Sequence, residues 1–370
     1  MTLPLPAGEP EVRVMLCDDS ATTRAILGRL LESEPGIRVV HRAGDGRAAL
    51  AALPEAKPDV VLLDLEMPVM DGMTALPLIL KAAPSTAVIV ASALTQRGAK
   101  AAIAALAAGA SDYVPKPQGA AGGAASPEFK AELIAKVRGW ARMKRRERAK
   151  PARPAPVPLR PVAPPPAVRG ARPASAGRPQ LLAIGCSTGG PQALAALVKR
   201  LPRLPLPVVV VQHMPAGFTT MLAEHLDRLG ALRCAEAVDG ESLAAGRIYL
   251  APGDRHLLVE GQQGAFRARL TSDPPENFCR PAVDPMLRSA VKATGGRLTA
   301  VILTGMGHDG LAGCRAVAAA GGEILAQDEA SSVVWGMPGA VARAGLPSLL
   351  APPEALADRI AAIAAERVTA

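Results

Sequence analysis

The chain has 370 residues, which is long enough for two domains. Of these residues 49% are hydrophobic and 20% charged, a composition typical of a soluble globular protein. Its net charge is +9, but the segment from Arg138 to Arg178 alone carries twelve lysines and arginines against one acid, a net +11, which leaves −2 for the rest. A basic excess confined to one segment is not the pattern of a nucleic-acid surface, and eight aromatic residues are too few for single-strand stacking platforms, so we expect no nucleic-acid partner.

The first part of the chain alternates short apolar runs with amphipathic segments at helical spacing. Strands are predicted at residues 12–17, 37–43, 60–64, 87–92 and 112–114, and helices at 22–32, 47–53, 74–83 and 99–108. Repeats of this length predict an α/β fold, a doubly wound sheet of five parallel strands with helices on both faces.

In such a sheet, functional groups collect at the carboxyl ends of the strands. Asp18 and Asp19 follow the first predicted strand, and Asp64 ends the third. Ser92 ends the fourth strand, and Lys116 follows the fifth. Each acid alone is more often a solvated loop residue, but three carboxylates that meet without basic neighbours suit a hard divalent ion such as Mg²⁺. A carboxylate beside that ion and a lysine can accept a phosphoryl group.

The order of these groups, DD, D-x-x-M-P, S and K-P, resembles the receiver domain of two-component response regulators, with DLEMP at 64–68 and DGM at 71–73. The resemblance implies that Asp64 is the phosphoryl acceptor and that it holds Mg²⁺ together with Asp18 and Asp19. It also implies that Ser92 and Lys116 sense the phosphoryl group.

A helix and a proline-rich segment follow the receiver-like part. Ser126 and Pro127 form a helix start, and the helix is predicted to reach Arg148. From 151 to 180, ten of thirty residues are proline, which predicts a semi-rigid tether with a reach of about 90 Å at roughly 3.1 Å per residue. The predicted division is a receiver domain at 1–122, a helix and linker at 123–179 and a catalytic domain at 180–370.

The second half resumes the alternation of strands and helices. Strands are predicted at 181–184, 208–211, 248–250 and 298–303, and near Leu257 and Arg267, with helices at 191–200, 219–229, 285–292 and 311–320. This pattern predicts a second, mainly parallel α/β domain with an antiparallel excursion around 261–264.

The stretch QLLAIGCSTGG at 180–190 follows the tether and fits the G-x-S-x-G spacing around Ser187. A serine at a sharp strand-to-helix turn needs small neighbours, so that the backbone can bend and a substrate carbonyl can approach. Ser187 is therefore a candidate nucleophile. Two alternatives stay open at this point, because a glycine-rich turn of this kind also cradles phosphates, and its serine can simply cap the helix.

Two further strand ends carry the partners that such a nucleophile requires. His213 follows the strand VVVVQ, and Asp309 follows the strand ending in LTGMG. Ser187 would attack a carbonyl, His213 would take and return its proton, and Asp309 would fix the imidazole tautomer. The alternatives are a satisfied polar histidine, an aspartate that caps the following helix, His308 as a rival base, and Cys186 as the nucleophile.

The motifs I-G-x-S-T-G-G, Q-H-M-P, R-P-A-V-D and L-T-G-M-G-x-D-G, together with the receiver pattern, resemble the chemotaxis protein-glutamate methylesterase and protein-glutamine glutaminase family. The resemblance implies a Ser187, His213 and Asp309 triad with the backbone amide of Met306 in the oxyanion hole. It implies demethylation of methyl-accepting chemoreceptors, deamidation of selected receptor glutamines, and a chemotaxis histidine kinase as phosphodonor. Mg²⁺ would serve receiver phosphorylation, with no cofactor for hydrolysis. Cys186 and the proline-rich tether depart from the expected pattern.

Five widely spaced cysteines without C-x-x-C spacing indicate neither a disulfide framework nor a zinc site. The N-terminus lacks the features of a signal peptide, and no apolar run approaches the roughly 20 residues of a membrane span. We therefore expect a cytoplasmic protein without membrane insertion.

Two rival functions remain, a response regulator whose second domain only binds, and a hydrolase of small esters.

Overall fold

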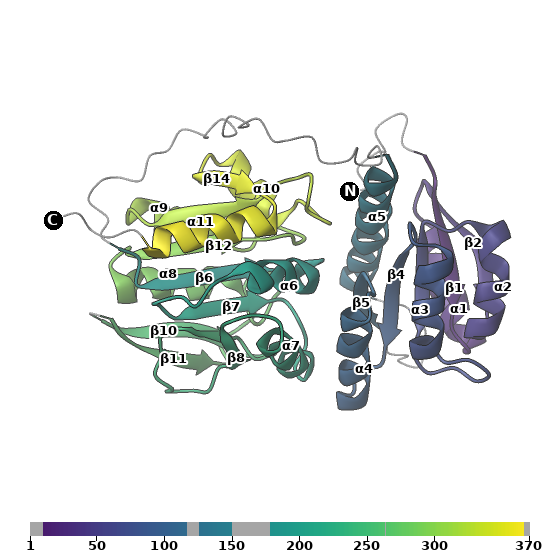
Figure 1. The fold of residues 1–370 in the computed structure, drawn as a ribbon, viewed down its shortest axis with the longest axis horizontal. Coiled ribbons are helices and arrows are strands. Elements are labelled where there is room, and N and C mark those ends of the chain that lie inside the picture. The colour runs from purple at the N-terminus through teal and green to yellow at the C-terminus, as the bar shows by residue number, and fades with distance from the viewer. Residues whose placement is uncertain (1–9, 117–125, 150–177, 263, 366–370) are drawn as a thin grey trace, which may run out of the picture. The chain divides into compact units, whose positions relative to one another are not determined.

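The structure is a computed structural model that describes residues 10–116, 126–149, 178–262 and 264–365 (Figure 1). The chain forms two compact units, Met1–Ala155 and Pro156–Ala370, which are described separately below. Most of the predicted tether, residues 151–180, lies outside the described residues. The predicted domain boundaries at 122/123 and 179/180 therefore stay predictions.

The first unit is built on the predicted five-stranded parallel sheet, and the structure shows that its strand order is β2-β1-β3-β4-β5. Its strands are β1 (Val12–Cys17), β2 (Ile37–Ala43), β3 (Val60–Asp64), β4 (Ala87–Ser92) and β5 (Asp112–Pro115), and its helices are α1 (Ala21–Glu32), α2 (Gly46–Ala56), α3 (Gly72–Ala82), α4 (Gln96–Ala107) and α5 (Pro127–Ala149). Helices α1 and α5 pack on one face of the sheet, while α2, α3 and α4 lie side by side on the other (Figure 1). The strand order reverses between β1 and β3, which places the ends of these two strands next to each other.

Side-chain caps begin the helices of this unit. The N-cap side chains of α1, α2, α3 and α4 each accept a hydrogen bond from the backbone amide three residues later; they are Ser20, Asp45, Asp71 and Thr95. Such caps satisfy amides that have no partner within the helix. Helices α2, α3 and α4 begin one to three residues before the predicted positions, because the cap and not the first apolar residue sets the start.

The second unit contains a seven-stranded sheet with the order β14-β13-β12-β6-β7-β9-β8, in which all neighbouring strands are parallel. The strands are β6 (Leu181–Cys186), β7 (Val208–Gln212), β8 (Arg233–Glu236), β9 (Arg247–Leu250), β12 (Leu298–Ile302), β13 (Glu323–Gln327) and β14 (Leu349–Ala351). A separate antiparallel hairpin, β10 (His256–Gln262) with β11 (Ala265–Thr271), is the predicted excursion. The helices are α6 (Gly190–Arg200), α7 (Phe218–Asp227), α8 (Val283–Thr294), α9 (Leu311–Ala319), α10 (Met337–Arg343) and α11 (Pro353–Ala365).

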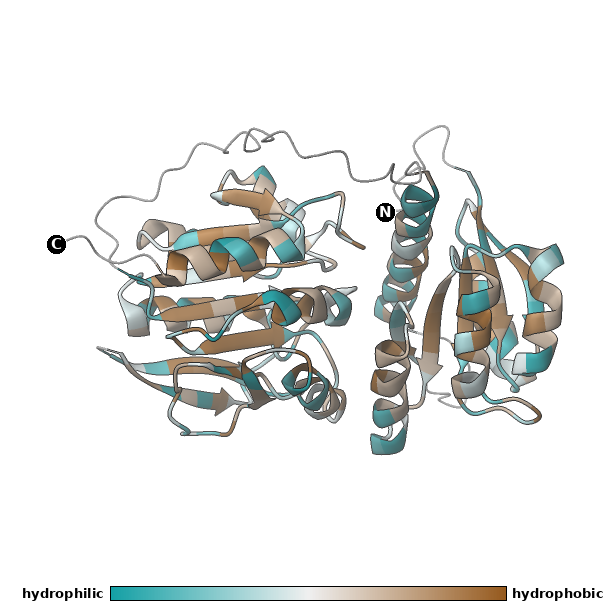
Figure 2. Ribbon diagram, in the orientation of Figure 1, coloured by the Kyte–Doolittle hydropathy of each residue, from teal (hydrophilic) through white to brown (hydrophobic). Residues whose placement is uncertain are grey.

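The elements that the sequence analysis missed are β8 and everything after residue 320, namely β13, α10, β14 and α11. Strand β13 shows the physical reason, since both of its end residues, Glu323 and Gln327, are polar and yet buried. Their side chains are paired inside the domain, which a pattern of apolar residues does not reveal. Figure 2 shows that the strands of both sheets are mainly hydrophobic, whereas α11 and α5 carry hydrophilic stretches.

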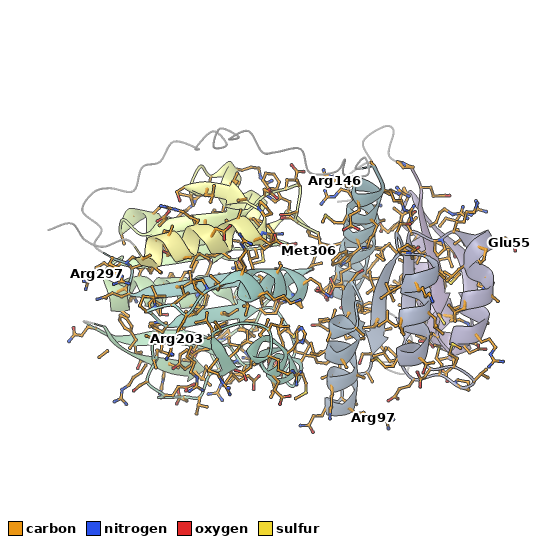
Figure 3. The ribbon with its side chains drawn as sticks, in the orientation of Figure 1. Glu55, Arg97, Arg146, Arg203, Arg297 and Met306 are labelled. Atoms are coloured by element: carbon orange, nitrogen blue, oxygen red, sulfur yellow. The ribbon has the colours of Figure 1, made fainter. Side chains whose placement is uncertain are left out.

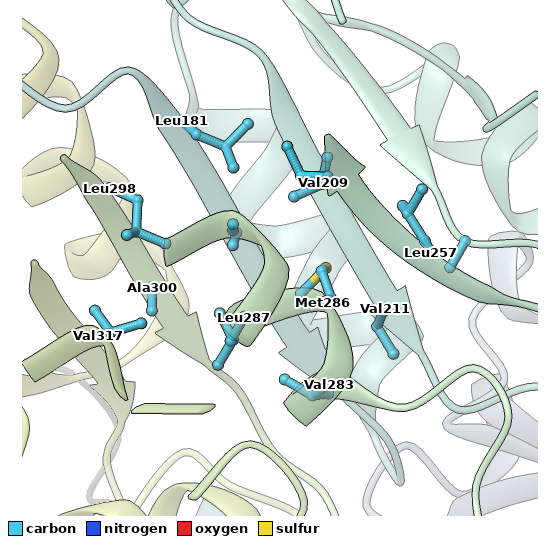
Figure 4. Packing of buried hydrophobic residues seen from close by; sticks show 14 of the residues in the cluster. Leu181, Val209, Val211, Leu257, Val283, Met286, Leu287, Leu298, Ala300 and Val317 are labelled. Carbon is cyan, nitrogen blue, oxygen red and sulfur yellow. The ribbon is translucent and has the colours of Figure 1, made fainter. Parts of the chain in front are cut away.

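The core that supports the site lies between the second sheet and α8. Val283, Met286 and Leu287 on one side of α8 pack against side chains of β6, β7 and β12 (Figure 4). Gly185 makes this close approach possible, because a Cβ atom there would lie 2.5 Å from Val283 Cγ1. The first glycine of the G-x-S-x-G pattern therefore brings the N-terminus of α8 against the end of β6.

Candidate active site

Ser187 lies at the turn between β6 and α6, where the sequence pattern predicted it. Its backbone N–H donates to the carbonyl of Thr304 at 3.0 Å, and its carbonyl accepts from the amide of Gly190 at 2.8 Å. Gly189 has a φ of +75°, a conformation that favours glycine, and it forms the N-cap of α6. These contacts hold the half-buried Ser187 between the ends of β6 and β12.

Strand pairing brings His213 next to Ser187. Cys186 and Gln212 are partners in the parallel pair of β6 and β7, and the amide of His213 donates to the carbonyl of Cys186 at 3.0 Å. The buried side-chain amide of Gln212 donates to the carbonyls of Ser187 at 2.9 Å and His213 at 3.1 Å. Gln212, to which the sequence analysis assigned no role, therefore holds the two turns together.

His213 and Asp309 are in direct contact, since His213 Nε2 lies 2.8 Å from Asp309 Oδ2. The buried Asp309 carboxylate also accepts the backbone amides of Val283 at 2.6 Å, Asp284 at 3.1 Å and Gly310 at 2.9 Å. Two of these amides belong to the first turn of α8, where the helix dipole favours a negative charge. The alternative that Asp309 caps the helix after it, α9, is wrong, because the carboxylate caps α8 instead.

The second ring nitrogen of His213 faces a cysteine that the sequence analysis did not select. Cys279 Sγ lies 3.4 Å from His213 Nδ1. Within the described residues, no hydrogen bond joins the Ser187 hydroxyl to His213. The Asp309 carboxylate accepts a hydrogen bond from the N–H at Nε2, so in the neutral ring Nδ1 carries the lone pair that can act as a base. The large separation of Cys279 from His213 in the sequence hid this contact.

Burial alone lowers the pKa of His213, but the hydrogen bonds to Asp309 and Cys279 outweigh it and raise the pKa to about 10, against a usual value of 6.5. Burial likewise acts to raise the pKa of Asp309, but its hydrogen bonds with His213 and with the amides of Val283 and Asp284 hold that pKa below the usual range. Both shifts favour an imidazolium and carboxylate pair in the free protein.

The raised pKa of His213 predicts an alkaline pH profile. A general base must be neutral, and its neutral fraction rises tenfold per pH unit below the pKa, so kcat/KM should increase steadily between about pH 7 and 9. Cys279→Ala removes one of the contacts that raise this pKa and should move the profile to lower pH. The measurement is kcat/KM against pH for both proteins, and a flat wild-type profile over this range contradicts the role of His213.

Asn277 and Asp284 complete the surroundings of Asp309 and were also missed. Asn277 Nδ2 donates to Asp309 Oδ1 at 2.9 Å and to Asp284 Oδ2 at 3.0 Å. Asp284 Oδ1 accepts from the amide of Gly313 in α9 at 2.6 Å. Asp284 belongs to the R-P-A-V-D motif, which the sequence analysis quoted without assigning it a function. The motif thus connects the Asp309 loop to α8.

The loop after β12 presents the predicted oxyanion donor. Within the described residues, the backbone amides of Met306 and Thr188 have no hydrogen-bond acceptor, so both can receive a developing negative charge. Met306, labelled in Figure 3, lies in this loop with its side chain 37% exposed. The amides of Gly336 and Met337 donate to the carbonyl of Gly305 at 3.0 and 2.9 Å, which holds the loop in place.

Gln327, at the end of β13, also supports the loop after β12 that carries Met306. Gln327 Oε1 accepts the amide of Thr304 at 2.8 Å, and the hydroxyl of Thr304 donates to the carbonyl of Thr188 at 2.9 Å. A Cβ atom at Gly305 would lie 2.9 Å from Ser187 Cβ, so only glycine fits there. The segments Ala326–Glu329 (AQDE) and Gly336–Pro338 (GMP) therefore position the residues on both sides of Ser187.

The other residues considered as alternatives occupy different surroundings. His308 is exposed, and no hydrogen bond among the described residues joins it to Asp309. Cys186 is fully buried, and burial raises the pKa of its thiol far above the usual value, which makes it an unreactive core residue. His256, to which the sequence analysis assigned no role, is buried with its ring between the amide of Ala282 and the carbonyl of Pro274.

The first unit contains the predicted acidic cluster at the carboxyl ends of β1 and β3. Oxygen atoms of Asp18, Asp19 and Asp64 lie within 4.8 Å of one another. Lys116 Nζ lies 2.6 Å from Asp64 Oδ2 and 3.2 Å from Asp18 Oδ2. Burial and the neighbouring Asp18 raise the pKa of Asp64 despite the opposing effect of Lys116. Ser92 is buried, and among the described residues no hydrogen bond links its hydroxyl to Asp64.

The donor set of this cluster fits Mg²⁺. Asp18 Oδ2 is buried and has no hydrogen-bond partner within the described residues, although it lies in ion-pair range of Lys116. Lys116 offsets only one of the three carboxylate charges, and a buried carboxylate oxygen without a hydrogen bond beside two further carboxylates is an environment that suits a hard cation. Asp18, Asp19 and Asp64 are thus the residues that would hold the ion.

No helix among the described residues is long and apolar enough to cross a membrane.

Residues 182–360 match the CheB methylesterase family, and residues 14–122 match the response regulator receiver domain. The chain is 50% identical over 368 residues to the protein-glutamate methylesterase/protein-glutamine glutaminase of Azospirillum brasilense, covering 94% of this chain and 93% of the relative.

A second relative, the protein-glutamate methylesterase/protein-glutamine glutaminase of group 2 operon from Rhodospirillum centenum, is 48% identical over 379 residues and covers 97% of this chain and 96% of the relative. Among solved structures, the catalytic domain of the CheB methylesterase from Thermotoga maritima is 40% identical, with a TM-score of 0.49. That match covers 50% of this chain and 98% of the solved one.

Proposed function

The chain belongs to the CheB methylesterase family with an N-terminal receiver domain, and from this premise we propose that it is a protein-glutamate methylesterase and protein-glutamine glutaminase regulated by phosphorylation. Its substrates are glutamyl methyl esters and selected glutamines of methyl-accepting chemoreceptors, and the reactions serve chemotactic adaptation. The observation that carries the proposal is the hydrogen bond between His213 and Asp309 beside the turn that presents Ser187.

In the proposed mechanism, the Ser187 hydroxyl attacks the ester carbonyl while His213 Nδ1 accepts its proton. The short contact between His213 Nε2 and Asp309 orients the ring and stabilises the imidazolium that forms. The tetrahedral oxyanion accepts hydrogen bonds from the amides of Met306 and Thr188, which have no acceptor in the part of the chain that the structure describes. Collapse of this intermediate breaks the bond to the methoxy group, to which His213 returns the proton, so that methanol leaves.

The second half of the cycle regenerates the serine. Water attacks the acyl-Ser187 carbonyl, His213 takes a proton from the water, and the returning proton converts Ser187 back to a hydroxyl while the glutamate leaves. A glutamine side chain follows the same steps with ammonia as the leaving group. One site can therefore serve both reactions, because both are acyl transfers to water.

Cys279 is the specific rival to Ser187, since its sulfur lies 3.4 Å from the basic nitrogen of His213. We assign the attack to Ser187 because it precedes Thr188, whose amide is unpaired, and packs beside Gly305 of the loop that carries the Met306 amide. A nucleophile must lie where the oxyanion of its tetrahedral adduct can accept hydrogen bonds from such amides. In the structure the Cys279 thiol occupies the side of His213 that the Ser187 hydroxyl must reach, so the imidazole has to exchange one partner for the other.

The receiver unit supplies the control of this activity. Asp64 accepts a phosphoryl group from a chemotaxis histidine kinase. Asp18, Asp19 and Asp64 would hold Mg²⁺, which would offset the negative charge of that group. Lys116 and Ser92 contact the phosphoryl group. All five cysteines are free, which is compatible with the cytoplasmic location that we propose.

The experiment that tests the function is methanol release from methylated receptors by the full chain, with and without a small-molecule phosphodonor. Wild-type protein should release methanol, and release should increase with the phosphodonor. A protein that binds methylated receptors but releases no methanol would contradict the proposal and favour a binding module. Equal hydrolysis of a generic acetate ester, without activity on receptors, would indicate a small-ester hydrolase instead.

A further inference from the structure

A tight turn at residues 276–279 lies directly against the proposed triad. Glu276 and Cys279 form an antiparallel bridge, with hydrogen bonds of 3.1 and 2.9 Å between their backbones. The two residues between them, Asn277 and Phe278, have φ values of +53° and +63°. Two central residues with positive φ are characteristic of a type I′ turn, in which asparagine is common and phenylalanine is not.

Side-chain contacts hold this turn on both sides. Asn277 donates to Asp309 at 2.9 Å and to Asp284 at 3.0 Å, as described above. Glu276 forms a two-pronged ion pair with Arg288 of α8, at 2.7 and 2.6 Å. Cys279 contacts His213. The turn is therefore tied to α8, to Asp309 and to His213 at the same time.

Phe278 stands at the tip of this turn with 96% of its surface exposed. A bulky side chain at positive φ is strained, and such strain persists only where the surroundings over-determine the backbone. The fixed neighbours of Phe278 provide that constraint. A single exposed apolar side chain needs no explanation by itself, but a backbone held in this strained conformation beside an active site points to a functional role for Phe278.

The position of Phe278 indicates what it binds. Its two neighbours contact Asp309 and His213, so the turn that carries Phe278 borders the proposed reaction centre. Of the three large apolar side chains exposed among the described residues of the second unit, two lie in loops of the site; the three are Val238, Phe278 and Met306. Phe278 and Met306 thus offer apolar surface from two different loops beside the same reaction centre.

We propose that Phe278 is a specificity-determining residue that docks the protein substrate by packing on an apolar side chain next to the modified glutamate. This inference rests on the proposed function, because the occupant is the receptor segment that carries the ester. A large aromatic contact at the edge of a site distinguishes a protein substrate from a small ester, because the small ester has no neighbouring side chain that could pack on the ring.

The test compares Phe278→Asn and wild type in the full chain on two substrates, a methylated receptor fragment and 4-nitrophenyl acetate. Asparagine accepts the left-handed backbone, so the exchange removes the ring without adding strain. We expect kcat/KM for the receptor to fall about tenfold or more, mainly through KM, while kcat/KM for the acetate stays within about twofold. Val238→Asn is the matched control, since Val238 is a 63% exposed apolar residue of the same unit, and it should change neither value.

Three results would overturn the inference. An unchanged receptor value shows that Phe278 does not contact the substrate, and an equal fall on both substrates shows that the turn merely supports the triad. A higher rate on the acetate in the variant shows that the Phe278 ring restricts access to the active site and does not dock the substrate. Failure of the wild-type protein to release methanol from the receptor would instead reject the proposed function, so that the two failures are distinguishable.

Discussion

Ser187→Ala is expected to lower turnover on methylated receptors by about 10⁶, and His213→Ala by a similar factor, because the two residues act as one unit in the attack. Asp309→Ala should cost less, about 10⁴, since it orients and stabilises the imidazole without touching the substrate. The Asp309 carboxylate accepts hydrogen bonds from α8 and from Asn277, so its variant needs a thermal unfolding measurement beside the kinetics. Methanol release under single-turnover conditions gives the rate constants.

Cys279 provides the matched control for Ser187, because both residues lie beside His213 and only one of them can be the nucleophile. Cys279→Ala should retain activity to within about tenfold, whereas Ser187→Ala should not. The opposite outcome, with Ser187→Ala active and Cys279→Ala inactive, would reassign the attack to the thiol. Trapping of an acyl intermediate on one residue or the other, followed by mass spectrometry, identifies the nucleophile independently.

Asp64→Ala is expected to abolish the stimulation of methanol release by a phosphodonor while leaving the basal rate unchanged. The reason is local, since Asp64 is the carboxylate that Lys116 contacts at 2.6 Å and that lies beside Asp18 and Asp19. A phosphoryl group there carries about two negative charges in place of the single charge of the carboxylate, and these require Mg²⁺ and Lys116 as partners. A hundredfold stimulation needs a shift of only about 2.7 kcal/mol between inactive and active states.

The matched control is Glu66→Ala, which removes a nearby exposed acid that pairs with Arg97 at 3.2 Å. This variant should respond to the phosphodonor like the wild type, and wild-type protein without Mg²⁺ should behave like Asp64→Ala. Stimulation that persists in Asp64→Ala would place the phosphoryl acceptor elsewhere.

The same assay decides how the signal reaches the active site. If the receiver inhibits the hydrolase, most molecules of the intact chain are inactive. Deletion of residues 1–178 should then raise the basal rate, because every remaining molecule is active. If phosphorylation only improves docking to receptors, the shortened chain will be no faster than the full one. An isolated second unit that is slower than or equal to the intact chain therefore rejects autoinhibition.

Regular local patterns were sufficient to predict much of the fold and of both sites. The alternation of apolar runs and helical segments predicted the first parallel sheet in full and four of the seven strands of the second, because strand and helix periodicities are properties of neighbouring residues. Parallel strands place their carboxyl ends at one edge, so the positions of Asp18, Asp64 and Lys116 followed from the predicted strand ends. The same reasoning predicted that Ser187, His213 and Asp309 lie at neighbouring strand ends. Their chemical roles remain predictions until the variants are measured.

The tertiary structure alone decided which groups contact the catalytic side chains. The turn with Asn277, Phe278 and Cys279 lies between β11 and α8, where no periodic pattern marks it, and it meets His213 across more than sixty positions of sequence. Gln212 and Gln327 are polar residues whose amides are satisfied only after folding, so composition and spacing contain no signal for them. Local sequence determines where strands and helices begin and end, but hydrogen bonds between distant loops depend on how those elements pack. The partners of His213, and with them its raised pKa, are therefore visible only in the folded chain.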